Sequence, residues 1–130
     1  MRELLEICII DDDAIAVFGL KRGMKAIGLQ NNLTVFENGL DALEDFEERA
    51  KKGDRLPSHI FVDLNMPIMD GWSFLEDFTK AYPSYTSHSH IFIMTSSINP
   101  EDMAKARTYG LSQNYLEKPV GAEVLEAVFS

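Results

Sequence analysis

Short apolar runs alternate along the chain with stretches in which apolar residues recur every three or four positions. The apolar runs cover Leu5–Ile10, Leu33–Phe36, Ile60–Asp63 and Ile91–Thr95, and a fifth, shorter run surrounds Tyr115. Short runs that are apolar at nearly every position are typical of strands covered on both faces of a sheet. The pattern therefore predicts five buried strands.

The stretches between and after these strands predict five helices, because their apolar residues recur with a helical period. Glycine ends three of them, near Gly28, Gly53 and Gly110. The start signals are Asp70, a plausible capping residue, and Asn99-Pro100-Glu101-Asp102, which combines a cap, a proline and first-turn acids. The apolar stripes comprise Val17, Leu20, Met24 and Ile27; Leu40, Leu43, Phe46 and Ala50; Trp72, Leu75, Phe78 and Tyr82; and, in the last helix, Val120, Val124, Leu125 and Val128.

Strands that alternate with helices indicate an α/β fold with a parallel sheet and helices on both faces, a doubly wound five-stranded sheet with five helices. A length of 130 residues fits one domain with one core, spanning residues 1–130. Only eleven residues follow Pro119, so we expect no output domain there.

The composition and charge of the chain exclude some classes of function. An apolar fraction of 45% is ordinary for a globular protein. The net charge of −9 argues against a nucleic-acid partner, because a protein that binds nucleic acid needs a basic face. The single cysteine, Cys8, excludes a disulfide within the chain and favours a reducing compartment. The chain has no signal peptide pattern and no apolar stretch approaching the ~18 residues of a membrane span. We expect a cytoplasmic protein with no membrane insertion.

Residues capable of phosphate or metal chemistry stand at the ends of four predicted strands. The acidic run 11–13 follows the first strand, Asp63 ends the third, Thr95 ends the fourth and Lys118 follows the fifth. Because the carboxyl ends of parallel strands share one edge of a sheet, and ligands bind at that edge, these side chains should converge on one site.

The acidic run suggests a divalent cation. Carboxylates at this position would repel phosphate unless a cation intervened, and hard oxygen ligands favour Mg²⁺. Asp13 is better interpreted as the cap of the first helix. One cap suffices, so Asp11 and Asp12 remain as candidate metal ligands.

Asp63 is the candidate nucleophile. A carboxylate can take up a phosphoryl group as an acyl phosphate, and phosphoryl transfer asks the protein chiefly for positioning and charge neutralisation. The turn-rich loop from Asn65 to Gly71 would hold backbone carbonyls near the same edge. Thr95 could donate its hydroxyl to a phosphoryl oxygen and Lys118 could pair with another. Tyr115 either packs on the sheet or moves together with Thr95. The sequence alone does not distinguish these two roles.

The three histidines are His59, His88 and His90. His88-Ser89-His90 has the composition of a metal-binding pair, but the stretch from Pro83 to His90 is predicted to be a polar loop away from the acids. A solvated loop is the favoured interpretation.

The chain resembles the receiver domain of two-component response regulators, specifically the stand-alone type like the chemotaxis regulator. Four motifs carry the resemblance, which covers essentially the whole chain. They are Ile9-Ile10-Asp11-Asp12-Asp13, the segment from Val62-Asp63-Leu64-Asn65 to Pro67-Ile68-Met69-Asp70-Gly71, Met94-Thr95-Ser96, and Glu117-Lys118-Pro119. The resemblance implies a flavodoxin-like sheet with strand order 2-1-3-4-5.

The resemblance further implies that a sensor histidine kinase phosphorylates Asp63. Mg²⁺ would be bound by Asp12, Asp63 and the backbone carbonyl of Asn65, with Asp11 acting through water. Thr95 and Lys118 would hold the phosphoryl group.

Further roles also come from the resemblance alone. Tyr115 would switch together with Thr95, and the fourth helix, fifth strand and fifth helix would form the output face. The Lys118–Pro119 peptide bond is expected to be cis. Asn65 and Ser96 occupy positions that tune phosphoryl lifetime, and Ser96 stands where many members have alanine. Implied partners are a downstream protein or a phosphotransfer protein, and a homodimer is compatible with the family.

Two alternatives remain open. An enzyme of the haloacid dehalogenase type would use Asp11 as nucleophile with Asp13, Thr95 and Lys118, although the later acidic pair is missing and Asp63 is left without a role. The other alternative is a pseudo-receiver that acts only by protein interaction. The receiver interpretation itself predicts no turnover enzyme, only a phosphoacceptor that assists its own phosphorylation and dephosphorylation.

Overall fold

Five parallel strands form one sheet in the computed structural model of the chain, which describes residues 5–29, 31–83 and 90–130. The strand order is β2-β1-β3-β4-β5, and every neighbouring pair is parallel. This order confirms the predicted doubly wound topology. The strands are β1 (Leu5–Ile10), β2 (Asn31–Phe36), β3 (His59–Asp63), β4 (His90–Thr95) and β5 (Tyr115–Glu117).

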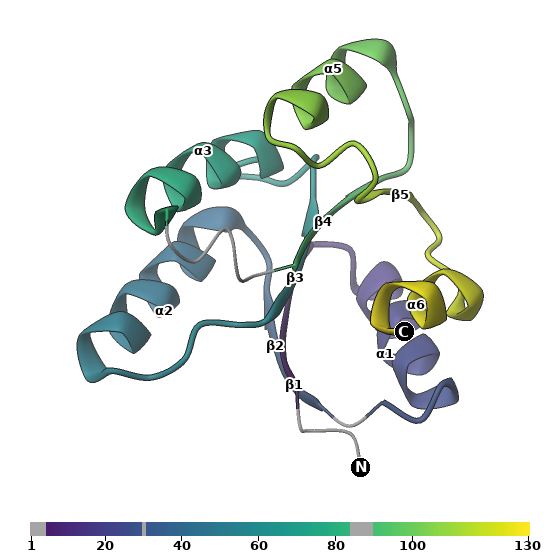
Figure 1. Ribbon diagram of the computed structural model, residues 1–130, viewed down its shortest axis with the longest axis horizontal. Helices are drawn as coiled ribbons and strands as arrows, with labels where there is room; N and C mark the ends of the chain where they lie inside the picture. The colour runs from purple at the N-terminus through teal and green to yellow at the C-terminus, as the bar shows by residue number, and fades with distance from the viewer. Residues whose placement is uncertain (1–4, 30, 84–89) are drawn as a thin grey trace.

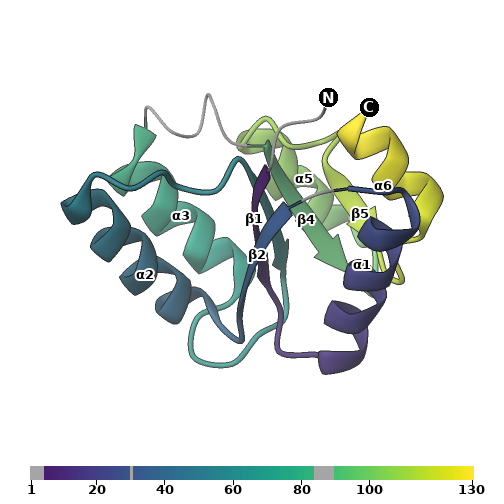
Figure 2. The same cartoon turned by 90° about the horizontal axis from the view of Figure 1, so that it is seen from below.

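Helices cover both faces of the sheet, as Figures 1 and 2 show. α2, α3 and α5 lie on one face, and α1 and α6 lie on the other. The five helices of the described residues are α1 (Ala14–Ala26), α2 (Gly39–Lys52), α3 (Gly71–Ala81), α5 (Pro100–Thr108) and α6 (Ala122–Phe129). None of them is both long enough and apolar enough to cross a bilayer.

The central strands are buried on both faces, which explains why they are apolar at nearly every position. In β1, Cys8 and Ile10 pack toward α2 and α3, while Ile7 and Ile9 pack toward α1 and α6. Phe46 of α2 is fully buried and makes edge contacts with two phenylalanine rings of α3. Replacing a buried phenylalanine with alanine typically costs about 3–5 kcal/mol of stability. This cluster therefore contributes strongly to the packing of α2 and α3 on the sheet.

The predicted capping residues cap the helices that follow them. The side chain of Asp13 accepts a hydrogen bond from the Ile15 amide, and Asp70 and Asn99 do the same at the starts of α3 and α5. Asn38 caps α2 in the same way, a role that the apolar pattern did not reveal. Each cap satisfies an amide that has no partner within its own helix.

Several boundaries differ from the sequence-based expectation. β2 begins at Asn31, two residues early, and α6 begins at Ala122, so Val120 precedes it. His90 is the first residue of β4, not the end of a polar loop, because its amide donates to the Ser58 carbonyl at 2.7 Å and extends the parallel ladder. Residues 84–89 of the expected loop, His88 among them, lie outside the described residues.

Candidate functional site

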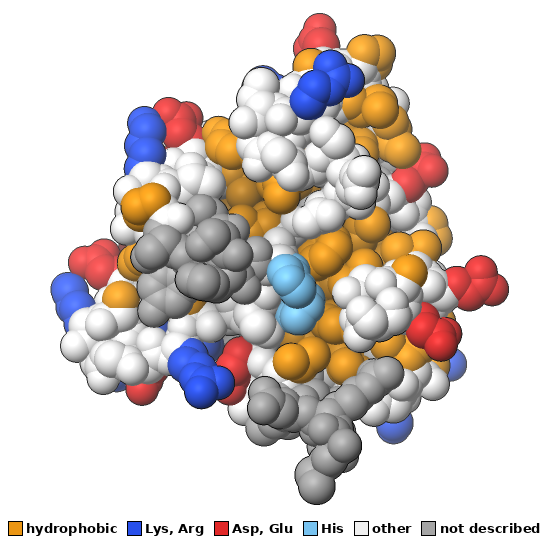
Figure 3. All heavy atoms as spheres, in the orientation of Figure 1, with side chains coloured by type: hydrophobic (Ala, Val, Ile, Leu, Met, Phe, Trp, Pro, Cys, Tyr) orange, Lys and Arg blue, Asp and Glu red, His pale blue; other side chains and the backbone are white. Residues whose placement is uncertain are grey.

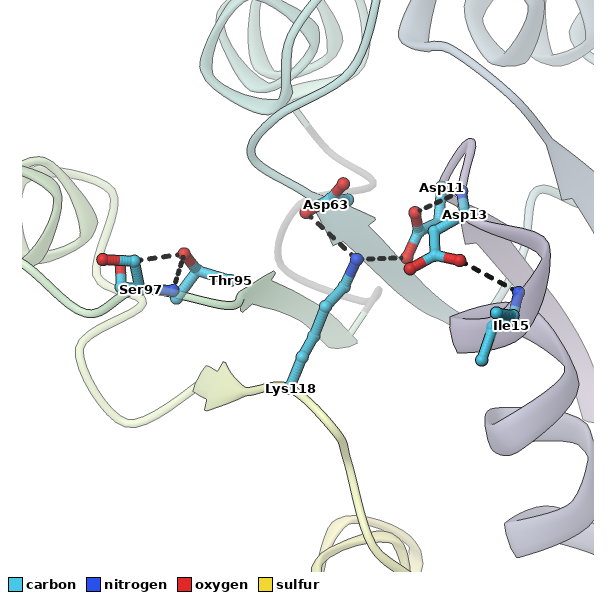
Figure 4. Close-up of polar contacts among 7 residues, drawn as sticks. All are labelled: Asp11, Asp13, Ile15, Asp63, Thr95, Ser97 and Lys118. Atoms are coloured by element: carbon cyan, nitrogen blue, oxygen red, sulfur yellow. Dashed lines mark hydrogen bonds and ion pairs between the residues drawn. The ribbon is translucent and has the colours of Figure 1, made fainter.

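The four predicted strand-end positions converge at the carboxyl edge of the sheet (Figure 4). Asp11 directly follows β1, Asp63 ends β3, Thr95 ends β4 and Lys118 directly follows β5. Backbone hydrogen bonds hold these ends in register: the Asp11 amide donates to the Phe36 carbonyl at 2.9 Å, and the Lys118 amide donates to the Thr95 carbonyl at 2.7 Å. The site is therefore positioned by the sheet itself.

Lys118 bridges two carboxylates. Its Nζ atom lies 2.7 Å from Oδ2 of Asp11 and 3.4 Å from Oδ1 of Asp63, as Figure 4 shows. The Lys118–Pro119 peptide bond is cis, as expected. The lysine thus neutralises part of the acidic charge at this edge of the sheet.

Three carboxylates gather around the same point. Oxygen atoms of Asp11, Asp12 and Asp63 lie within 4.8 Å of one another. Asp11 is buried, and its Oδ2 atom forms the ion pair with Lys118. Asp13 does not join the cluster, because its side chain caps α1. Three carboxylates this close together, two of them buried, fit a hard divalent cation.

Burial and charge shift the pKa values of the two central groups. Burial, followed by the nearby Asp11 carboxylate, raises the pKa of Asp63 from 3.8 to about 6, against the opposing effects of Lys118 and the Asn65 backbone. Burial by itself would lower the pKa of Lys118, but the two carboxylates outweigh it and raise that pKa. The lysine consequently remains a cation at neutral pH.

The loop after β3 holds Asp63 in place from the other side. The Gly71 amide donates to the Leu64 carbonyl at 3.1 Å, and a Cβ atom on Gly71 would lie only 2.6 Å from the Asp63 carbonyl oxygen. The start of α3 can approach Asp63 this closely because the residue there has no side chain. Asn65 is exposed in the same loop, two residues after Asp63.

Thr95 is buried at the edge, but its hydroxyl does not contact Asp63 in this structure. It donates to the Ser97 carbonyl at 3.0 Å and accepts from the Ser97 amide at 3.1 Å (Figure 4). Ser96 is exposed and lines a cavity of about 310 Å³ between α1 and the segment Lys118–Val120.

Tyr115 lies on β5, and its hydroxyl is buried without a hydrogen bond of normal geometry. Burial, followed by the nearby Asp102 carboxylate, raises the pKa of Tyr115, while the backbone of Asn99 acts in the opposite direction. A buried hydroxyl without a hydrogen bond of good geometry lowers the stability of the fold.

Two residues near Tyr115 were not identified as functional from the sequence. Trp72 of α3 donates from Nε1 to Oδ1 of Asp102 at 2.9 Å, which ties α3 to α5. The other carboxylate oxygen of Asp102 accepts from the Asn99 side chain at 2.8 Å. From the sequence, Trp72 was expected only on the apolar stripe of its helix, and Asp102 only as an acid in the first turn of its helix. Neither pattern shows that the two side chains contact each other.

The fold and the site together define a doubly wound domain with a strand-end aspartate, an acid cluster and a bridging lysine, an arrangement suited to phosphoryl transfer. The sequence matches the response regulator receiver domain over residues 7–130, and the chain belongs to this family. Receiver domains of two-component response regulators are phosphorylated on an aspartate and act as phosphoacceptor signalling modules, generally not as turnover enzymes.

Individual relatives agree with this assignment. The chain is 30% identical over 119 residues to the sensor histidine kinase CheAY of Helicobacter pylori, covering 92% of this chain but only 14% of that protein. It is 29% identical over 121 residues to protein PilG of Pseudomonas aeruginosa, covering 93% and 82% of the two chains. A two-component response regulator from Cytophaga hutchinsonii superposes with a TM-score of 0.84 at 28% identity, covering 98% of this chain and 96% of that one.

Proposed function

We propose that this receiver domain accepts a phosphoryl group on Asp63 from a sensor histidine kinase and signals through a change at Thr95 and Tyr115. The observation that carries the proposal is the bridge by Lys118 between Asp63 and Asp11 at one edge of the sheet. Asp63 is the carboxylate of this cluster that ends a strand. The alternative function, an enzyme of the haloacid dehalogenase type, gives Asp63 no role.

The residues present fit a Mg²⁺ ion. Asp12, Asp63 and the backbone carbonyl of Asn65 would bind it, and Asp11 would act through a water molecule. The close approach of the Asp11, Asp12 and Asp63 carboxylates, within 4.8 Å of one another, supports this assignment. When bound, the ion supplies positive charge that offsets the carboxylates and the incoming phosphoryl oxygens.

The chain's own residues account for the rest of the reaction. A carboxylate oxygen of Asp63 forms the new P–O bond while the bond from phosphorus to the donor nitrogen breaks, and the donor imidazole leaves with that electron pair. Lys118 pairs with one phosphoryl oxygen, and Thr95 turns its hydroxyl from Ser97 to another. Tyr115 then follows Thr95, so the output face α5–β5–α6 changes.

Partners follow from the same proposal. A histidine kinase delivers the phosphoryl group in the cytoplasm, and either a downstream target protein or a phosphotransfer protein reads the output face. The net charge of −9 supports protein partners over nucleic acid. We assign the lifetime of the acyl phosphate to Asn65 and Ser96, both exposed beside the site where an attacking water would enter.

A small phosphodonor tests the proposal directly. Acetyl phosphate with Mg²⁺ should add the mass of one phosphoryl group to the intact chain, and Asp63→Asn should abolish the gain. Asp13→Asn is a matched control: this acid lies beside the cluster but caps α1, so labelling should persist. A pseudo-receiver would give no labelling at all. Turnover of a phosphate ester that survives Asp63→Asn but not Asp11→Asn would instead support the dehalogenase-type enzyme.

A further inference from the structure

Two histidines form a close pair at the edge of the sheet opposite Asp63. His59 begins β3 and His90 begins β4, and the two residues are direct neighbours in the parallel register. Nε2 of His59 lies 2.9 Å from Nδ1 of His90. Figure 3 shows histidine atoms at the surface beside a patch of hydrophobic side chains. The candidate phosphorylation site does not use this pair.

The hydrogen bonds around the pair fix which nitrogen of His59 is free. The Ser58 hydroxyl lies 3.1 Å from the Glu6 carbonyl, which can only accept, so the hydroxyl donates there. Ser58 Oγ therefore accepts from Nδ1–H of His59 at 2.9 Å. Nε2 of His59 is left with a lone pair, 2.9 Å from Nδ1 of His90. Metal-binding histidines are oriented in this way, by donating the other ring N–H to a neighbouring oxygen.

The surroundings keep one imidazole fixed and leave the other accessible. His59 is 7% exposed, stacks against Phe92 and makes a tilted ring contact with Phe129. Burial, followed by the neighbouring His90, lowers the pKa of His59 to about 4, so its nitrogen carries no extra proton at neutral pH. His90 is exposed and stands at a cavity of about 480 Å³ that is also lined by Gln113 and Asn114. Water molecules can therefore reach the pair from one side.

We propose that His59 Nε2 and His90 Nδ1 form a two-imidazole site for a divalent transition-metal ion, Ni²⁺ or Cu²⁺. Metal–nitrogen bonds of about 2.0–2.1 Å to two atoms 2.9 Å apart subtend an angle of about 90° at the metal. This is the angle between neighbouring positions of square-planar or octahedral sites. A tetrahedral Zn²⁺ site would need the two nitrogens to lie about 3.3 Å apart.

Metal binding at the pair needs no net release of a proton. The N–H proton of the His90 ring leaves Nδ1, where the metal binds, and a proton from water is taken up at Nε2. The hydrogen bond between the two rings is replaced by two metal–nitrogen bonds. Water completes the coordination on the side of the cavity.

Calorimetric titration with Ni²⁺, in millimolar Mg²⁺ to occupy the acidic site, tests the proposal. We expect one ion per chain and weaker binding of Zn²⁺. His90→Asn should weaken Ni²⁺ binding about tenfold or more while circular dichroism shows an unchanged fold. His59→Gln, at the buried position, should have the same effect where it folds. With Cu²⁺, the electron paramagnetic resonance spectrum should show coupling to two nitrogens.

Two controls make the test decisive. Asp12→Asn, in the acid cluster, and His88→Asn, at the third histidine, should each leave Ni²⁺ affinity unchanged. Absence of binding, or binding that survives His90→Asn, would overturn the proposal. A loss in His88→Asn equal to that in His90→Asn would also overturn it, in favour of chelation within the sequence His88-Ser89-His90. Phosphodonor labelling of Asp63 should be the same in His90→Asn, so the two proposals fail separately.

Discussion

Ile68 has a backbone conformation that β-branched residues rarely adopt. Its φ angle is 69°, and it is the one non-glycine residue with positive φ among the described residues. The Met69 amide donates to the Pro67 carbonyl at 2.7 Å across it, so the loop after Asp63 turns sharply at this point. The Ile68 side chain is 78% exposed, and little burial compensates for the strain.

Replacing Ile68 with asparagine should stabilise the protein. Asparagine tolerates the left-handed region, and removing a β-branched residue from it should raise the free energy of unfolding by about 1 kcal/mol. Chemical denaturation measures the change. Ile98→Asn is the control, since Ile98 is also an exposed loop isoleucine but has no positive φ, and its substitution should be nearly neutral. Equal effects of the two substitutions would show that strain is not the cause.

At the scale of single residues, the sequence predicted which side chains meet but not how they pair. Strand-end positions were sufficient to bring Asp11, Asp63 and Lys118 to one edge, because parallel topology fixes where strands end. The same reasoning could not show that Lys118 lies closer to Asp11 than to Asp63, or that the Thr95 hydroxyl bonds to Ser97. Those details depend on side-chain rotamers, about which the pattern of apolar residues carries no information.

At the scale of helices and strands, the close contact of α3 with the end of β3 depends on Gly71. A Cβ atom there would lie 2.6 Å from the Asp63 carbonyl oxygen and 2.9 Å from the Leu64 Cα atom, both of them backbone atoms that cannot move aside cheaply. α3 therefore can begin at this distance from Asp63 only with glycine at its first position.

Gly71→Ala should destabilise the protein by about 1–3 kcal/mol, the usual cost of an added methyl group that forces the backbone to shift. Gly19→Ala, in the middle of α1, is a matched control because nothing lies within 4 Å of its added Cβ. There the better helix propensity of alanine should increase stability by about 0.8–1 kcal/mol. Thermal denaturation of both variants compares the two, and stabilisation by Gly71→Ala would contradict the close approach.

Trp72 is the other link between elements and provides a measurable signal. It is the single tryptophan of the chain, its indole stacks on Tyr109 with ring centres 5.9 Å apart, and it bonds to Asp102 of α5. If α5 moves when Asp63 is phosphorylated, tryptophan fluorescence should change with acetyl phosphate and Mg²⁺. Asp63→Asn should abolish the change. A fluorescence change that persists in that variant would report Mg²⁺ or donor binding rather than the switch.

For the whole molecule, the periodicity of the sequence predicted the sheet, the helices and the convergent edge. Alternation of apolar runs with helical stripes is sufficient for this, because burial on both faces dictates the pattern of every central strand. Contacts between distant segments that follow no repeating pattern could not be predicted. Two examples are the hydrogen bond between His59 and His90, which lie 31 residues apart in the sequence, and the one between Trp72 and Asp102, which lie 30 residues apart.

The crowded acid site should limit the stability of the metal-free protein in a pH-dependent way. The pKa of Asp63 is about 6 in the folded chain, against 3.8 as its ordinary value. A carboxyl group whose pKa is higher in the folded state favours folding at low pH, and this contribution is lost as the pH rises toward about 6. Without Mg²⁺, Asp63→Asn should therefore be more stable than the wild type at neutral pH, with a difference that shrinks toward pH about 4. A pH-independent difference would contradict this assignment.

Mg²⁺ should reverse this penalty in the wild type, and should stabilise Asp63→Asn less. A ligand that binds only the folded state stabilises it by about 2.7 kcal/mol at a hundredfold excess over its Kd. Asp63→Asn removes one charged ligand but keeps Asp11 and Asp12, so its gain should be smaller and should require more Mg²⁺. The acids that destabilise the metal-free protein would thus stabilise it once a cation is bound.

Thermal denaturation with and without millimolar Mg²⁺ measures the gain in stability of the wild type and of Asp63→Asn. Samples treated with a chelator to remove divalent cations give the melting temperatures of the metal-free proteins. A wild-type melting temperature that does not respond to Mg²⁺ would rule out the proposed metal site, whatever the phosphodonor experiment shows.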